Sequence, residues 1–102
     1  MIAIPTGAIA ALPNIVELRE ALAAALADAD GEVVVDTSGL AEVDFSFLQL
    51  LEAARRHALA TGRKLTLAAP ASPVLSAAML RAGLTPDTAP DPHFWFHGAP
   101  QP

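Results

Sequence analysis

Two aspartates and a serine are the residues of this chain whose types and spacing come closest to a reactive site. Asp36 ends a run of valines, Asp44 follows after a short loop, and Ser46 lies two positions further on. Nearby carboxylates can form a paired acid site or bind Mg²⁺, but a hard cation needs several converging oxygens. No acidic pair lies near the first predicted strand to supply them. The sequence therefore favours local capping of loops by both carboxylates and predicts no metal site.

The three histidines, His57, His93 and His97, do not complete a catalytic or zinc-binding set. His93 and His97 are four residues apart, but the prolines around them disfavour a helix, and no Cys or Glu lies at ligand spacing. The chain contains no cysteine, no G-x-S-x-G elbow and no glycine-rich phosphate loop. We therefore expect no catalytic residue and no cofactor, and the chain is predicted not to be an enzyme.

Composition and charge restrict the class of protein. The 102 residues fit one domain, and 53% hydrophobic against 17% charged residues provide enough apolar material for a core. The net charge of −5, from six basic and eleven acidic residues, argues against binding to nucleic acid or to an anionic membrane surface. The longest apolar run, residues 21–27, is too short for membrane insertion, and no signal peptide is evident. We therefore expect a cytoplasmic location.

Predicted strands alternate with predicted helices along the first 84 residues. The strands are residues 1–4, 32–36 and 64–67. The first is expected at a sheet edge, and the β-branched middle one is expected to be covered on both faces. Such alternation predicts an α/β fold in which a small, mostly parallel sheet is packed with helices through right-handed crossovers.

Capping residues indicate where the helices begin and end. Asn14 is predicted to cap the first helix and Ser46 the second. Ser72 followed by proline is a strong start signal for the third helix, which Gly83 and Leu84 are expected to end in a Schellman motif. The second helix is expected to bury an apolar stripe and to turn its charged residues to water. The stripe is Phe47, Leu50 or Leu51, Ala54 and Ala58, and the charged residues are Glu52, Arg55 and Arg56.

The chain changes character after residue 84. Five of its nine prolines lie in residues 86–102, so no long regular element is expected there. We therefore divide the chain into a domain at residues 1–84 and a proline-rich tail at residues 85–102. The tail contains the aromatic cluster Phe94, Trp95 and Phe96. Two interpretations are open: a lid whose rings hold the tail on the domain, or a second interface for a partner.

The domain resembles the STAS family, which includes the anti-sigma-factor antagonists. The resemblance rests on Val33–Leu40, then Val43-Asp44, then Leu48–Leu51, in that order. Residues 61–67 and 73–84 are similar to the family's next strand and helix, and Gly7-Ala8-Ile9 is similar to its entry into the first helix. The resemblance implies a STAS-like (βα)n domain that docks onto a protein partner, often a kinase-like anti-sigma factor of bacteria.

The resemblance also implies where docking occurs. In many members a Ser or Thr directly after a conserved Asp is phosphorylated, which switches docking off. The conserved Asp matches Asp44, and the phosphoacceptor position matches Phe45, which has no hydroxyl. Two interpretations follow: docking is constitutive, or Ser46 has taken over as the phosphosite, its alternative role being a helix cap. The implied partner-binding residues are Asp44, Phe45, Ser46, Leu48 and Gln49.

Three functions are compatible with these observations. The first is a regulatory adaptor that binds an anti-sigma factor, a kinase-like protein or another bacterial signalling partner. The second is a cytoplasmic STAS subunit of a lipid-transport ATPase complex, because the family also includes such proteins. The third is a small-molecule sensor whose apolar pocket is closed by the aromatic tail. A domain of this size is expected to have modest stability, and formation of a homodimer would add to it.

Overall fold

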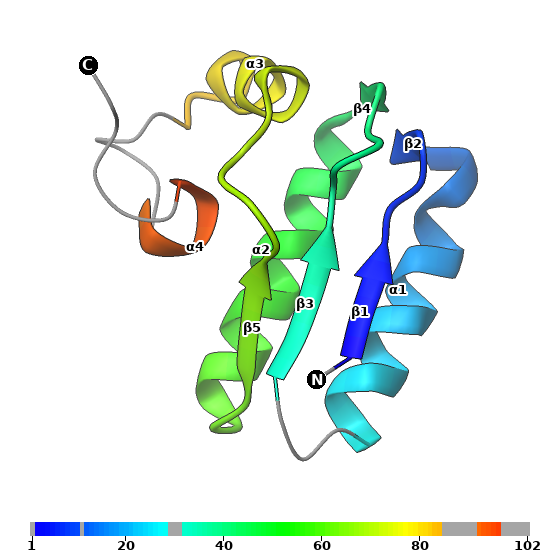
Figure 1. The fold of residues 1–102 in the computed structure, drawn as a ribbon, viewed down its shortest axis with the longest axis vertical. Helices are drawn as coiled ribbons and strands as arrows, with labels where there is room; N and C mark the ends of the chain where they lie inside the picture. The colour runs from blue at the N-terminus through cyan, green and yellow to red at the C-terminus, as the bar shows by residue number, and fades with distance from the viewer. Residues whose placement is uncertain (1, 11, 29–31, 85–91, 97–102) are drawn as a thin grey trace.

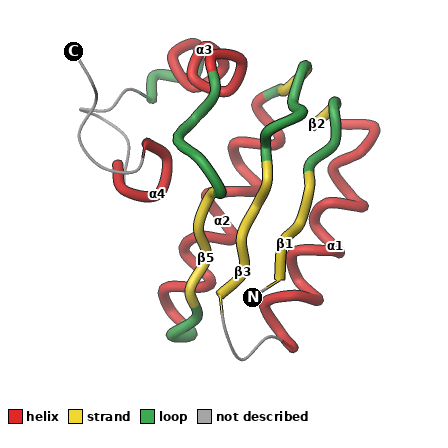
Figure 2. Tube along the Cα trace, in the orientation of Figure 1, coloured by secondary structure: helices red, strands yellow, loops and turns green. Residues whose placement is uncertain are grey.

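The arrangement of strands and helices is shown in Figures 1 and 2. The computed structural model describes residues 2–10, 12–28, 32–84 and 92–96. The elements are β1 (Ile2–Pro5), β2 (Ile9–Ala10), α1 (Leu12–Asp28), β3 (Glu32–Asp36), β4 (Glu42–Val43), α2 (Phe45–Ala60), β5 (Lys64–Leu67), α3 (Pro73–Arg81) and α4 (Pro92–Phe96). The predicted α/β fold is confirmed. The two-residue strands β2 and β4 were not predicted, because elements so short have no periodic pattern.

β1, β3 and β5 form a parallel sheet with β3 in the middle. Each new strand is added on the same side of the last, so right-handed crossovers place α1 and α2 on one face of the sheet (Figure 1). Among the described residues, α1 and α2 cover only one face of β3, contrary to the expectation that helices cover both faces. Val33 and Val35 are fully buried against the helices, whereas Val34, which alternates to the other face, is only half-buried.

The carboxyl ends of the strands lead into the part of the molecule where α2 begins. There β2 pairs with β4 in parallel, and the N–H groups of Ala41 and Glu42 both donate to the carbonyl oxygen of Ala8, at 2.7 and 2.9 Å. α3 lies beyond the same edge of the sheet (Figure 1) and contacts β4. Crevices outside the carboxyl ends of parallel strands are the usual binding sites of open α/β sheets.

Two of the three predicted helix starts differ from the structure. α1 begins at Leu12, so Asn14 lies inside the helix and is not its cap. A proline at the second helical position explains the earlier start, because its missing N–H would have no partner in the first turn anyway. α2 begins at Phe45 and is capped by Asp44 in place of Ser46.

Both ends of α3 agree with the sequence. Ser72 caps the start, its hydroxyl oxygen accepting from the N–H of Leu75 at 3.3 Å. At the other end Gly83 adopts φ 84°, its N–H donates to Leu80 at 3.0 Å, and the N–H of Leu84 donates to Met79 at 2.7 Å. These are the two hydrogen bonds of a Schellman motif.

The core lies between the sheet and the helices and also includes two aromatic rings of α4. Phe94 is 6% and Trp95 0% exposed, and their rings meet edge to face with centroids 5.1 Å apart. The N–H of Ala71 donates to the carbonyl oxygen of Trp95 at 2.9 Å, and α4 packs beside β5. Phe94 and Trp95 thus pack on the domain. The structure does not describe the side chain of Phe96. Residues 85–91 and 97–102 of the tail, which include His97, lie outside the described residues.

Candidate functional site

Asp44 fixes the turn from which α2 starts. Its backbone is extended (φ −123°, ψ −179°), and its Oδ1 accepts from the N–H of Ser46 at 3.0 Å. The N–H of Phe47 donates to the carbonyl oxygen of Asp44 at 3.2 Å. A carboxylate here satisfies free N–H groups of the first turn and complements the positive end of the helix dipole. The predicted cap, Ser46, lies inside the helix instead.

Ser46 is half-buried and bonded to the cap. Its hydroxyl donates to the same Oδ1 of Asp44 that the backbone N–H uses. A phosphate on Ser46 would replace this bond and would stand beside a carboxylate, where like charges repel. The geometry gives Ser46 a structural role in the turn, and phosphorylation of Ser46 stays a prediction.

Phe45 and Phe47 have opposite environments although both lie in the first turn of α2. Phe47 is fully buried in the core, whereas Phe45 is 57% exposed. Phe45 is the one exposed aromatic side chain in the described part of the chain. An exposed ring costs solvation free energy that burial against a partner would recover.

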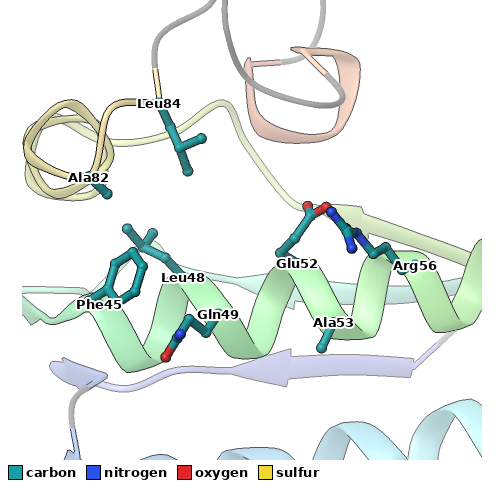
Figure 3. Close-up of a pocket in the computed structure, with 8 residues that line it drawn as sticks. All are labelled: Phe45, Leu48, Gln49, Glu52, Ala53, Arg56, Ala82 and Leu84. Carbon is teal, nitrogen blue, oxygen red and sulfur yellow. Dashed lines mark hydrogen bonds and ion pairs between the residues drawn. The ribbon is translucent and has the colours of Figure 1, made fainter.

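A hollow of about 530 Å³ opens between α2 and the end of α3. Phe45 and Leu48 rise from α2 toward Ala82 and Leu84 (Figure 3). Leu48 is only 3% exposed, so a partner could contact it only by entering this hollow. Gln49, which also lines the hollow, is exposed. The other lining residues are Glu52, Ala53 and Arg56.

A second hollow, of about 580 Å³, shares Phe45 and Ala82 with the first. Its other lining residues are Val43, Asp44, Ala78 and Arg81. Arg81 lies in the last turn of α3, is exposed, and forms no ion pair with any residue that the structure describes. The exposed ring of Phe45 therefore borders two hollows, and the second of them is also lined by the charged side chains of Asp44 and Arg81.

Glu52 joins Arg55 and Arg56 in a network along α2. Nε and Nη2 of Arg55 donate to its two carboxylate oxygens at 2.8 and 2.6 Å, and Nε of Arg56 donates at 2.8 Å. The Arg55 side chain is 13% exposed, so the expectation that it faces water is wrong, whereas that of Arg56 is 71% exposed. The hydrogen bonds from Arg55, and then Arg56, hold the pKa of Glu52 below its ordinary value.

Asp36 lies in a separate turn at the end of β3. Its Oδ1 accepts from the N–H of Ser38 at 2.9 Å, and hydrogen bonds from Ser38 hold the pKa of Asp36 below its ordinary value. Both Asp36 and Asp44 thus bond to the backbone of their own turns. Within residues 2–10, 12–28, 32–84 and 92–96, no three His, Cys, Asp or Glu side chains are grouped to hold a metal ion.

Comparison with models of protein families matches residues 8–86 to the family described as Mlab, STAS domain. The matched range is well over half of the chain and runs from β2 through α3. The chain belongs to the STAS family. Comparison with curated proteins and with solved structures found no significant match.

The STAS assignment confirms the family predicted from the sequence. STAS domains are in general regulatory modules that mediate protein–protein interaction and have no enzymatic activity. In this STAS domain, none of the described helices has the length and apolarity needed to cross a bilayer.

The sequence analysis singled out residues on the α2 side of these hollows but none on the α3 side. Phe45, Leu48 and Gln49 line the first hollow together. Their role in binding a partner stays a prediction. The residues on the α3 side are Arg81, Ala82 and Leu84. The Schellman signal at residues 83–84 was the available clue, since that motif commonly turns its last residue back to pack against the helix end.

Proposed function

We propose that this STAS domain is a non-enzymatic docking module that binds a protein partner through the surface around Phe45, without a phosphorylation switch at that position. The partner class is a bacterial signalling protein, such as an anti-sigma factor or another kinase-like protein. The observation that carries the proposal is the 57% exposure of Phe45 at the capped start of α2. At the matching position the family often has a phosphoacceptor.

The physical basis is the energy of burying an aromatic anchor. A few aromatic or Arg residues at the centre of an interface usually supply most of its binding energy. Phe45 lines two hollows, so a partner that fills either of them would bury part of its ring. No kinase can modify a phenyl ring, and the hydroxyl of Ser46 is bonded to the cap. Docking is therefore constitutive.

A second candidate function is that of a lasting cytoplasmic subunit in a lipid-transport ATPase complex. The same feature favours it, because a permanent assembly needs no release switch and uses more apolar contacts than a transient one. The apolar residues Phe45, Leu48, Ala53, Ala82 and Leu84 around the first hollow meet that requirement.

The test is capture of partners from extracts of the native host by the tagged full chain, with bound proteins quantified by mass spectrometry. Phe45→Ala should lose the partners that the unmodified chain retains. Leu59→Ala is the matched control, because Leu59 is 75% exposed on the same helix but lies outside both hollows. A captured signalling protein supports the first function, and an ATPase with its permease the second. Equal capture by Phe45→Ala would remove Phe45 from the interface.

A further inference from the structure

We infer that a hollow between β5, the second half of α2 and α4, here called the basic hollow, binds a small phosphate anion. The anion is either inorganic phosphate or the phosphate group of a small molecule, and Arg63 and Lys64 hold it. The basic hollow shares no lining residue with the two hollows beside Phe45, so the inference is independent of the proposed function.

The basic hollow has the size of a small ligand. Its volume is about 250 Å³, and its walls come from α2, from β5 with the residue before it, and from α4, which lies beside β5 (Figure 1). Pockets that enclose drug-sized molecules are usually larger, with volumes of about 300–1,000 Å³. Nucleic acid needs an extended positive groove that follows its backbone. The dimensions therefore favour a compact anion.

The charges that line the basic hollow all have the same sign. Arg55, Arg63 and Lys64 are three of the six Lys and Arg residues of a chain whose net charge is −5. Among the described residues that line the basic hollow, none carries a carboxylate. The two hollows beside Phe45 differ in this respect, because cations and carboxylates line each of them together. The basic hollow is thus a local concentration of positive charge on an acidic protein.

Carboxylates outside the lining neutralise this charge only in part. Nη2 of Arg55 lies 2.6 Å from an oxygen of Glu52, whereas Nζ of Lys64 lies 3.8 Å from an oxygen of Glu32. The side chain of Lys64 is 71% exposed, so that long ion pair is weak and screened by solvent. Arg63 forms no ion pair within the described part of the chain. At least one positive charge of the basic hollow is therefore unbalanced.

The guanidinium of Arg63 also has an unused hydrogen-bond donor. Arg63 is half-buried, and its Nη1 donates to the carbonyl oxygen of Leu26 at 2.7 Å, which fixes the position of the group. Its Nη2 is buried and has no hydrogen-bond partner among the residues that the structure describes. A buried donor without an acceptor is costly, and such a donor often marks a bound water or ion. Because Arg63 also lacks a counter-charge, an anion fits better than water.

Phosphate matches these donors better than a single carboxylate does. A phosphate monoester carries nearly two negative charges at neutral pH and three acceptor oxygens. It can therefore accept from the planar guanidinium of Arg63 and from the ammonium of Lys64 at the same time. A carboxylate supplies one charge and two oxygens.

The position of α4 provides a readout of binding. Phe94 lines the basic hollow and meets the ring of Trp95 edge to face, with centroids 5.1 Å apart. Trp95 is the single tryptophan of the chain. An anion in the basic hollow lies one residue layer from this ring, so the fluorescence of Trp95 should report its binding.

The experiment titrates inorganic phosphate into the full chain at neutral pH, with ionic strength held constant by sodium chloride. Trp95 fluorescence should change saturably, and the melting temperature should rise with phosphate, as for any ligand of the folded state. Arg63→Gln should weaken binding about tenfold, since it removes a charged donor. Lys64→Gln should weaken binding about threefold and leaves the bond from residue 63 to Leu26 intact. Arg19→Gln, an equal change of charge at an exposed position of α1, should bind as the unmodified chain does.

A parallel titration distinguishes the two sources of phosphate. Tighter binding of glycerol 3-phosphate than of inorganic phosphate, without binding of glycerol, assigns the basic hollow to a phosphorylated small molecule. The reverse order assigns it to free phosphate.

Three results would overturn the inference. The first is the absence of a saturable response to either phosphate compound. The second is acetate that binds as tightly as phosphate. The third is an equal loss of binding in Arg19→Gln, Arg63→Gln and Lys64→Gln, because binding would then follow the net charge of the chain and not the basic hollow.

Discussion

The two aromatic regions of this molecule have opposite environments. Phe45 at the start of α2 is 57% exposed beside the hollow between α2 and the end of α3, whereas Phe94 and Trp95 on α4 are buried in the core. In the sequence, the cluster of three aromatics in the tail is the more conspicuous of the two. The structure makes two of those three part of the packing and leaves the isolated Phe45 in contact with solvent. Local density of aromatic residues in the sequence therefore did not indicate which aromatic side chain is exposed.

One ion pair lies between the two regions. Glu52 lines the hollow between α2 and the end of α3, and its partner Arg55 lines a separate hollow of about 250 Å³ together with Phe94. The pair therefore links the side of α2 that carries Phe45 to the side that faces Phe94.

The largest effect on stability should come from the buried region. Trp95→Ala is expected to lower the free energy of unfolding by about 3–5 kcal/mol, because it empties a fully buried site. Trp95→Phe should cost clearly less, since Nε1 of Trp95 has no hydrogen-bond partner within the described residues and most of the ring volume is kept. Urea unfolding measures both, with the exposed His93→Ala on the same helix as control. A loss below about 1 kcal/mol for Trp95→Ala would mean that α4 contributes little to the core.

An intermediate effect is expected at the ion pair. Glu52→Gln should lower the free energy of unfolding by about 1 kcal/mol at neutral pH. The pKa of Glu52 is lower in the folded than in the unfolded chain, so the unfolded chain binds more protons as the pH falls below about 4.3. The stabilisation by Glu52 is therefore present above that pH and is lost as the pH falls through the lowered folded-state pKa.

Urea unfolding across this acidic range tests the sign. The difference between the unmodified chain and Glu52→Gln should shrink toward zero with falling pH, while Glu20→Gln, an exposed position on α1, should show little difference at neutral pH. A difference that grows on acidification would contradict the lowered pKa.

The smallest effect on stability is expected at the exposed aromatic. Phe45→Ala should change the free energy of unfolding by about 1 kcal/mol or less, since more than half of the side chain is already in water. Phe47→Ala, two residues away but fully buried, is the matched contrast and should cost about 3–5 kcal/mol. Equal losses for the two substitutions in urea unfolding would erase the distinction between a recognition residue and a core residue.

The sequence predicted the order of the main elements because each carries its own local signal. These signals are the valines of β3, Ser72-Pro73 at the start of α3 and the glycine at its end. Each depends only on residues within a few positions of it in the sequence. The start of α2 was predicted two residues too late, since Asp44 and Ser46 are both good caps. The requirement to bury Phe47 and Leu51 is tertiary and is not visible locally.

The candidate site was predictable only in part for the same reason. Phe45, Leu48 and Gln49 follow one another along α2, so a family resemblance could place them together. The contribution of Ala82, Leu84 and Arg81 depends on how the end of α3 packs against α2, across thirty or more positions of sequence. Coverage of β3 on one face depends likewise on the order in which strands join the sheet.

Because α1 and α2 lie on the same side of the β1–β3–β5 sheet, neighbouring strand positions differ in the substitutions that they tolerate. Val33 and Val35 accept almost no change of volume, because each is enclosed by the helices. Ala3 and Val34 lie on the side of the sheet away from α1 and α2 and are less buried. Substitution by other residues with a similar strand preference should be tolerated at both positions. Along these strands we therefore expect positions that tolerate few substitutions to alternate with positions that tolerate many.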